Sequence, residues 1–206
     1  MSELIKILYD ILIQNEFNKY FLDLLYVEAK NKEEADNDKF VRIPDSVTYI
    51  DDYAFCHCTS LTSIIIPESV TYIGIQVFNS CNSLTSIIIP NSVTYIGWAA
   101  FINCKSLTSI TIPNSMDEIK DCVFENCISL TSITIPESVR IIDVCAFSGC
   151  SSITLIIIPE SVKIICDSSF EKCTNLISII IPKLFESGMN EIFKEVDLSK
   201  VEITYT

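Results

Sequence analysis

The feature that most constrains this chain is a repeat of 23 residues. All seven prolines follow it, at Pro44, Pro67, Pro90, Pro113, Pro136, Pro159 and Pro182. Phenylalanine and cysteine keep the same step over six copies each, from Phe55 to Phe170 and from Cys58 to Cys173. A unit this short cannot bury its own apolar face, so neighbouring units must stack and share a core. The repeat therefore predicts a solenoid in which each copy forms one coil.

The alternation of side chains indicates how each coil folds. In the segment 61–66, Ile64 and Ile66 are expected to point inward, because strand side chains alternate. Ser63 and Ile65 then point outward, and the proline that follows ends the strand. The pattern Leu-x-x-Ile-x-Ile at this period is typical of leucine-rich-repeat solenoids. We predict an α/β solenoid of that type, right-handed, with about six to seven coils, one parallel β-sheet and a column of stacked phenylalanines.

The two ends of the chain depart from the repeat. Apolar residues near the N-terminus follow helical spacing, and the first strand is expected at Phe40–Ile43. Past the last proline, residues 184–196 look helical and Val201–Tyr205 alternates like an edge strand. Open solenoid ends usually carry atypical caps. We predict three parts, namely a helical N-terminal cap (1–38), a leucine-rich-repeat solenoid (39–182) and a C-terminal cap (183–206).

Charge restricts the partners of such a solenoid. The chain carries 14 Lys and Arg against 27 Asp and Glu, a net charge of −13. Nucleic-acid binding needs clustered cations that neutralise phosphates, so we expect no nucleic-acid partner. An acidic surface is also repelled by anionic lipid. The longest apolar runs are far shorter than the ~18 residues needed to span a bilayer, so we expect no membrane insertion.

The cysteines bear on the compartment. Ten cysteines without a recognisable signal peptide favour a reducing environment over a disulfide framework. We therefore predict a cytoplasmic protein, with the cell surface as the alternative. Six of the cysteines fall in an inward column and are interpreted as buried, reduced thiols. Cys122 and Cys145 share one column on consecutive coils, within disulfide range, and whether they pair stays open.

Residues that could carry catalysis or bind metal are scarce. The one histidine, His57, lies between Cys56 and Cys58, where alternate side chains point apart and no second pair completes four ligands. A Cys–His nucleophile also needs a cleft and a third, orienting group. We predict no metal site, no cofactor and no enzyme activity. Two acidic pairs are interpreted as solvating charge, Asp51 with Asp52 and Asp117 with Glu118.

The outward strand positions form the candidate binding surface. Contiguous exposed apolar strips often mark interaction sites, although the β-propensity of Ile and Thr is an alternative explanation. A second aromatic cluster, on another face, consists of Tyr49, Tyr72 and Tyr95, with Trp98 nearby. The predicted partner-binding residues are Phe40, Arg42, Ile65, Ile88, Thr111, Thr134, Leu155, Ile157 and Ile180.

The recurring unit Ala-Phe-x-x-Cys-x-x-Leu-Thr-x-Ile-x-Ile-Pro-x-Ser-Val resembles the BspA-like leucine-rich repeats over residues 38 to 182, and most closely at Ala100–Pro113. The Ile-Pro-x-Ser-Val segment is also similar to the FNIP type of repeat, but the Phe and Cys columns favour the BspA-like family. Members of that family include secreted or surface adhesins, so the resemblance implies adhesion as one role.

These observations lead to one prediction of function and one alternative. We expect a non-enzymatic scaffold, monomeric, that binds a protein partner of unknown identity through the strand-bearing face. The alternative is a cell-surface or adhesive structural protein that is exported without a recognisable signal. A thiol count on the native protein separates them, because ten free cysteines favour the cytosol and disulfides favour the surface.

Overall fold

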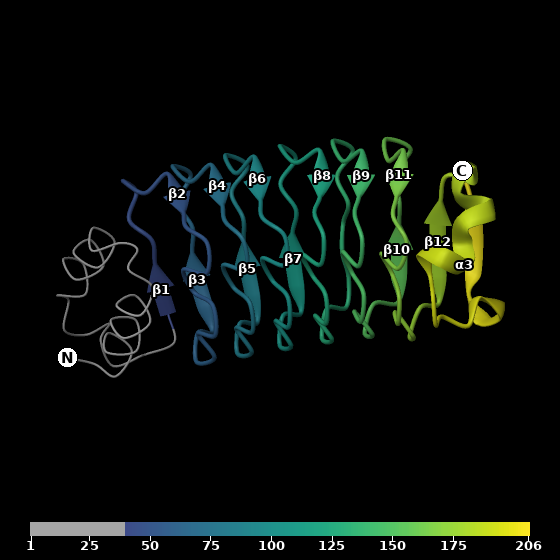
Figure 1. Cartoon of the computed structure of the whole chain (residues 1–206), viewed down its shortest axis with the longest axis horizontal. Coiled ribbons are helices and arrows are strands. Elements are labelled where there is room, and N and C mark those ends of the chain that lie inside the picture. Colours follow the sequence, from purple (N-terminus) through teal and green to yellow (C-terminus); the bar gives the residue numbers. More distant parts are fainter. Residues whose placement is uncertain (1–39) are drawn as a thin grey trace.

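The computed structural model describes residues 40–206, which form a β-solenoid of about seven turns with parallel strands. The turns follow one another along the long axis of the molecule (Figure 1). The predicted solenoid and its number of coils are confirmed. The helical cap predicted over 1–38 lies outside the described residues. Within 40–206, no helix has both the length and the apolar character needed to cross a membrane.

One row of strands occupies the predicted Leu-x-x-Ile-x-Ile segments and forms what we call the first strand face (Figure 1). It consists of β1 (Phe40–Arg42), β3 (Ser63–Ile65), β5 (Ser86–Ile88), β7 (Ser109–Thr111), β10 (Leu155–Ile157) and β12 (Ser178–Ile181). Val41 pairs with Ile64, which occupies the same position of the next coil, as the 23-residue repeat predicts. The predicted alternation also holds, since Ile87 is 4% exposed and its neighbour Ile88 is 78% exposed.

A second row of strands was not predicted. This second strand face consists of β2 (Tyr49–Ile50), β4 (Tyr72–Ile73), β6 (Tyr95–Ile96), β8 (Glu118–Ile119), β9 (Ile141–Ile142) and β11 (Ile164–Ile165). Its strands follow each proline by a few residues, in segments such as Val70–Ile73 that are rich in β-branched and aromatic residues. Those residue types favour strands, so the return path of each coil also pairs with its neighbours.

The prediction of one parallel sheet is wrong, because the strands of residues 40–206 form four short sheets, two on each face. On the first strand face, β7 ends one sheet and β10 begins the next. Between them, the rung at 132–134 keeps only an isolated bridge from Thr134 to Thr111. On the second strand face the ladder stops between β6 and β8. Since each strand has only two to four residues, the loss of one or two hydrogen bonds ends a sheet.

The segment from the second strand face to the next first-face strand contains turns, and we call it the turn face. In the coil around Phe55, Tyr53 and His57 have φ of 61° and 60°, and positive φ recurs at these two positions in later coils. The left-handed conformation is incompatible with an α-helix, which corrects the expected α/β class to a β-solenoid. The Phe55 amide donates to the Val77 carbonyl oxygen at 2.9 Å, and the equivalent bond recurs at each core phenylalanine through Phe170.

The predicted phenylalanine column forms the centre of the core. Rings stack from Phe55 to Phe193, with centroids 5.1 to 5.6 Å apart and interplanar angles of 3° to 16°. Each of these rings is at most 1% exposed. The last ring, Phe193, keeps the 23-residue step beyond Phe170. Phe193 was not predicted, because the residues around it no longer match the repeat motif.

The C-terminal residues continue the stack of coils. They comprise η1 (Lys183–Gly188), α3 (Met189–Ile192), η2 (Leu198–Lys200) and β13 (Glu202–Tyr205). The predicted helix over 184–196 is thus limited to a 3₁₀ segment and one short α-helix. The predicted edge strand is confirmed, because β13 pairs in parallel with β12 and places Ile203 opposite Ile179.

We expect Phe101→Ala to lower the free energy of unfolding by about 3–5 kcal/mol, because it removes a fully buried ring from the middle of the stack. Denaturant titration followed by circular dichroism measures this loss. Ile128→Ala, at a side chain that is 43% exposed, serves as the control and should stay within about 1 kcal/mol of the parent. Equal stability of the two variants would show that the phenylalanine column contributes no core packing.

Candidate functional site

The structure brings most of the predicted binding residues into one row along the first strand face. Backbone pairing aligns Arg42 with Ile65, Ile65 with Ile88 and Ile88 with Thr111, and the isolated bridge adds Thr134. Ile157 pairs with Ile180 in the second sheet of this face. The predicted side chains are exposed except Ile180, which is half-buried beside the added strand β13.

The row divides into two apolar patches. The N-terminal patch contains Phe40, Ile65 and Ile88, which are 43%, 46% and 78% exposed. The C-terminal patch contains Leu155 and Ile157, which are 42% and 47% exposed. Polar side chains at the two coils between them separate the patches, namely Ser109, Thr111, Ser132 and Thr134. The surface therefore offers two apolar contact points about 14 Å apart rather than one continuous strip.

One exposed residue of the C-terminal patch, Ile177, was not among the predicted binding residues. Ile177 is 64% exposed and directly precedes β12. Its column otherwise holds threonine, at Thr62, Thr85, Thr108, Thr131 and Thr154. The sequence marks Ile177 only by its difference from the threonine of the other coils, and the prediction used positions that the coils share.

Carboxylates border both patches at the turn after each strand. Asp45 and Glu68 follow β1 and β3, while Glu137 and Glu160 follow the two rungs near the C-terminal patch. All four side chains are exposed, and the Glu160 carboxylate accepts a hydrogen bond from the Thr206 hydroxyl at 2.6 Å. The rim therefore carries carboxylates beside both apolar patches, while Asn91 and Asn114 occupy the same position between the two groups of carboxylates.

The predicted aromatic cluster lies on the second strand face and serves the packing between coils. Tyr72 stacks on Tyr49 and Tyr95 with ring centroids 4.7 and 4.5 Å away. Desolvation and the hydrogen bond that the Tyr49 hydroxyl donates to Asp51 raise the pKa of Tyr49 to about 12. Trp98 is 41% exposed next to this ladder in the sequence.

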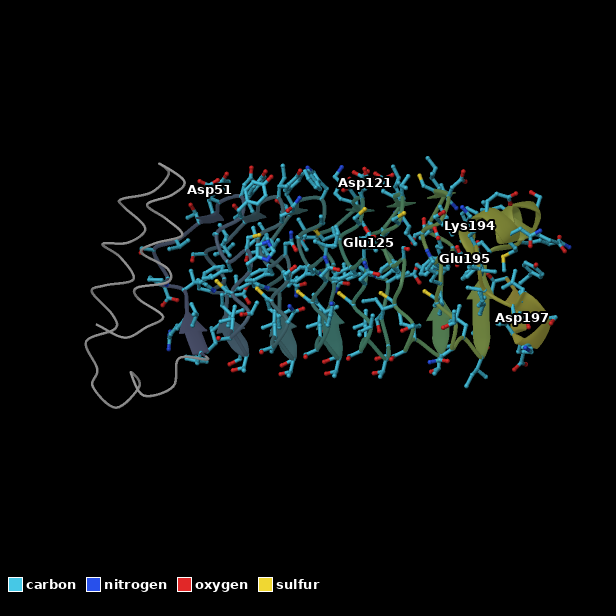
Figure 2. The ribbon with its side chains drawn as sticks, turned by 60° about the horizontal axis from the view of Figure 1, so that its bottom comes forward. Asp51, Asp121, Glu125, Lys194, Glu195 and Asp197 are labelled. Carbon is cyan, nitrogen blue, oxygen red and sulfur yellow. The ribbon has the colours of Figure 1, made fainter. Side chains whose placement is uncertain are left out.

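The acidic pair at the first coil has a structural role that differs from the predicted solvating charge. The Asp51 carboxylate accepts from the Asp52 amide at 2.8 Å, and the Asp52 carboxylate accepts from the Ile75 amide of the next coil at 2.7 Å. Both side chains are half-buried. These carboxylates therefore hold backbone amides, and Asp51 lies at the N-terminal end of the described solenoid (Figure 2). His57 is exposed on the turn face, where its amide donates to the Asn79 carbonyl oxygen.

The inward cysteine column is buried, as predicted. From Cys81 onward, each thiol donates a hydrogen bond to the carbonyl oxygen of the preceding coil's phenylalanine, at 3.1 to 3.3 Å. Burial raises the pKa of Cys127 and of Cys173 to about 12. All ten cysteines are free thiols. Across residues 40–206, no group of three or more His, Cys, Asp or Glu is arranged to hold a metal ion.

Comparison with known families agrees with this geometry. Residues 33–154 and residues 94–206 each match the model of the BspA type leucine rich repeat region, which comprises six copies. The chain belongs to the BspA-type leucine-rich repeat family. The resemblance drawn from the Phe, Cys and Pro columns is thereby confirmed. Because each repeat forms one coil, the outward residues of the candidate surface recur once per coil.

Two solved structures share the BspA-type fold. The leucine-rich repeat protein of T. pallidum is 26% identical, with a TM-score of 0.50 over 80% of this chain and 72% of that protein. A leucine-rich repeat protein from Eubacterium ventriosum is 27% identical, with a TM-score of 0.52 over 65% of this chain and 42% of that protein. No curated protein matches the chain.

We expect the BspA-type core to lose stability at high pH. A buried thiol whose pKa is raised to about 12 keeps its proton while the unfolded chain, with a thiol pKa near 9.0, releases it. Stability is therefore complete below about pH 9 and falls as the pH rises toward 12. In Cys127→Ala the fall should be shallower by about 1.4 kcal/mol per pH unit.

Denaturant titrations at pH 7, 9, 10 and 11 test this expectation. Ser132→Ala changes an exposed, non-titrating side chain of a neighbouring segment and should keep the slope of the parent. Identical slopes for the parent and Cys127→Ala between pH 9 and 11 would contradict the expected proton release.

Proposed function

We propose that this chain is a non-enzymatic scaffold that binds a protein partner through the first strand face of its solenoid. The observation that carries the proposal is the exposure of Ile88, which is 78% exposed within a row of outward side chains. A β-branched apolar residue in solvent contributes nothing to the core, whereas at an interface its burial is favourable.

The dimensions of the surface support an interface of ordinary size. Ile88 and Ile157 lie three coils apart, about 14 Å by the spacing of strands. A standard protein–protein interface covers about 800 Å² on each partner, which is enough to span both apolar patches. The polar residues between the patches suit the energetically neutral contacts that usually surround interface hot spots.

Charge supports a partner with cationic side chains. The chain carries a net charge of −13, and exposed carboxylates such as Glu68 and Glu137 border the apolar patches. Complementary charge accelerates encounter and selects among partners more than it strengthens the final complex. We therefore propose that lysine or arginine of the partner faces the rim while apolar side chains cover the isoleucines.

Thiol chemistry supports the cytoplasm as the compartment for this interaction. All ten cysteines are free, and six of them are buried in one column of the core. Export to an oxidising cell surface, as the alternative of an adhesive protein requires, would expose the half-buried thiols to disulfide formation. The compartment, like the monomeric state, is part of the proposal.

The double variant Ile88→Glu with Ile157→Glu tests the face. Both carboxylates would have to be desolvated on docking, so capture of the partner should fall at least 100-fold. The partner is the main protein that crosslinks to the parent in an extract of the source cell, identified by mass spectrometry. Binding of that protein is then measured by surface plasmon resonance.

The matched control is Val144→Glu with Ile164→Glu. These side chains are 44% and 49% exposed, but they lie outside the first strand face. The control should retain capture, and both double variants should keep the circular dichroism spectrum of the parent. Full capture by the Ile88→Glu, Ile157→Glu protein would refute this face as the binding surface.

A further inference from the structure

Cys122 and Cys145 lie at the same position of two consecutive coils on the turn face. The Cys122 amide donates to the Val144 carbonyl oxygen at 3.0 Å, and the two cysteines have φ of 56° and 55°. Because the backbones match, the two Cα–Cβ bonds point in the same direction. Parallel backbones lie about 4.8 Å apart, and disulfides join Cα atoms about 4.4–6.8 Å apart. The geometry places this pair within reach of a disulfide.

The core cysteines provide a contrast inside the same molecule. They also recur once per coil, but they are buried, and from Cys81 onward each thiol is held by a hydrogen bond to a carbonyl oxygen. Cys122 and Cys145 are half-exposed and occupy the same position of adjacent coils. The other half-exposed cysteines, Cys56 and Cys166, have no cysteine at the same position of an adjacent described coil. Within residues 40–206, Cys122 and Cys145 are therefore the one pair of cysteines that are both accessible to solvent and placed at the same position of adjacent coils.

We propose that Cys122 and Cys145 form a reversible disulfide that joins two coils, by exchange with a low-molecular-weight disulfide. The thiolate of Cys145 attacks that disulfide, forms a mixed disulfide and releases one thiolate. The thiolate of Cys122 then attacks the Cys145 sulfur, and the second thiolate leaves. Two protons and two electrons pass from the cysteines to the reagent, which becomes two thiols.

The position of the pair gives the disulfide a mechanical role. Cys122 and Cys145 belong to the coils that end in the rungs 131–135 and 154–158 of the first strand face. Among the described residues, no backbone hydrogen bond joins these two rungs, whereas Thr131 donates to Thr108 and Ile177 to Thr154 at the neighbouring rungs. A covalent link on the turn face would therefore fasten the one coil junction where the first strand face is open, between its two apolar patches.

Two features make the link reversible and selective. A disulfide between two half-exposed residues is accessible to reductants, so the bond is readily reduced. The carboxylates of Asp121, Glu125 and Glu171 place negative charge near the two thiols. Asp121 and Glu125 lie in the same part of the solenoid (Figure 2). Burial and these carboxylates raise the pKa of both thiols, so the thiolate fraction, and with it the rate of exchange, increases with pH. This negative field favours a cationic reagent, such as cystamine, over anionic glutathione disulfide.

The experiment oxidises the full-length protein with cystamine and traps the remaining thiols with N-ethylmaleimide in denaturant. The number of alkylated cysteines should fall from ten to eight. Trypsin should then yield linked peptides 121–140 and 141–163, whose fragmentation assigns the bond to Cys122 and Cys145 rather than to Cys127 and Cys150. Glutathione disulfide should react at least 10-fold more slowly.

Variants and a thermal melt complete the test. Cys122→Ser and Cys145→Ser should each lose the link, while Cys166→Ser, which removes a half-exposed cysteine outside the pair, should keep it. The link should raise the melting temperature of the parent by about 5 °C, and dithiothreitol should reverse the shift. Ten alkylated cysteines, a stable mixed disulfide or a link through a core cysteine would each overturn the proposal. A link that leaves the melting temperature unchanged would overturn its mechanical role.

Discussion

The column of phenylalanines joins each coil to the next in two ways. Each ring stacks on its neighbour at 5.1 to 5.6 Å, and each phenylalanine amide from Phe55 to Phe170 donates to the backbone of the following coil. The left-handed residues on either side of the ring extend this line, because the amides of Tyr53 and His57 also donate to carbonyl oxygens of the next coil. The strand ladders break on both faces, whereas this line continues, so the turn face sets the spacing that the rest of the solenoid adopts.

A continuous turn face leaves the two strand faces free to vary. Residues 132–134 form only an isolated bridge instead of a strand, yet the rings of Phe124 and Phe147 in the adjoining coils remain stacked at 5.3 Å. Outward positions can therefore change from Ile88 to Thr111 to Ile157 at little cost to the fold. In a solenoid, stability depends on nearest-neighbour contacts, and the phenylalanine stack supplies such contacts without using the outward side chains of the candidate binding surface. The scaffold and the surface are thus separable in sequence.

Features that recur in every coil could be predicted from the sequence, whereas features that differ between coils or occupy very short segments could not. Proline, phenylalanine and cysteine columns determined the coil, and the alternation around Ile88 identified its outward side. The second strand row was missed because two-residue strands such as Tyr72–Ile73 are too short to show periodicity. Ile177 was missed because it departs from a threonine column, and the break between the two sheets of the first strand face arises from backbone hydrogen bonds that residue type does not determine.

The cysteines show how position within one coil decides chemistry. Cys127 and Cys122 lie in the same coil and Cys150 and Cys145 in the next, so both pairs have the same spacing along the solenoid. The inner pair donates to carbonyl oxygens and is sealed from reagents, whereas the outer pair is half-exposed beside carboxylates. Because the outer pair lies at the junction where the first strand face is open, the proposed disulfide would act on the coil junction that separates the two apolar patches. Redox state and partner binding would then be coupled through a single coil junction.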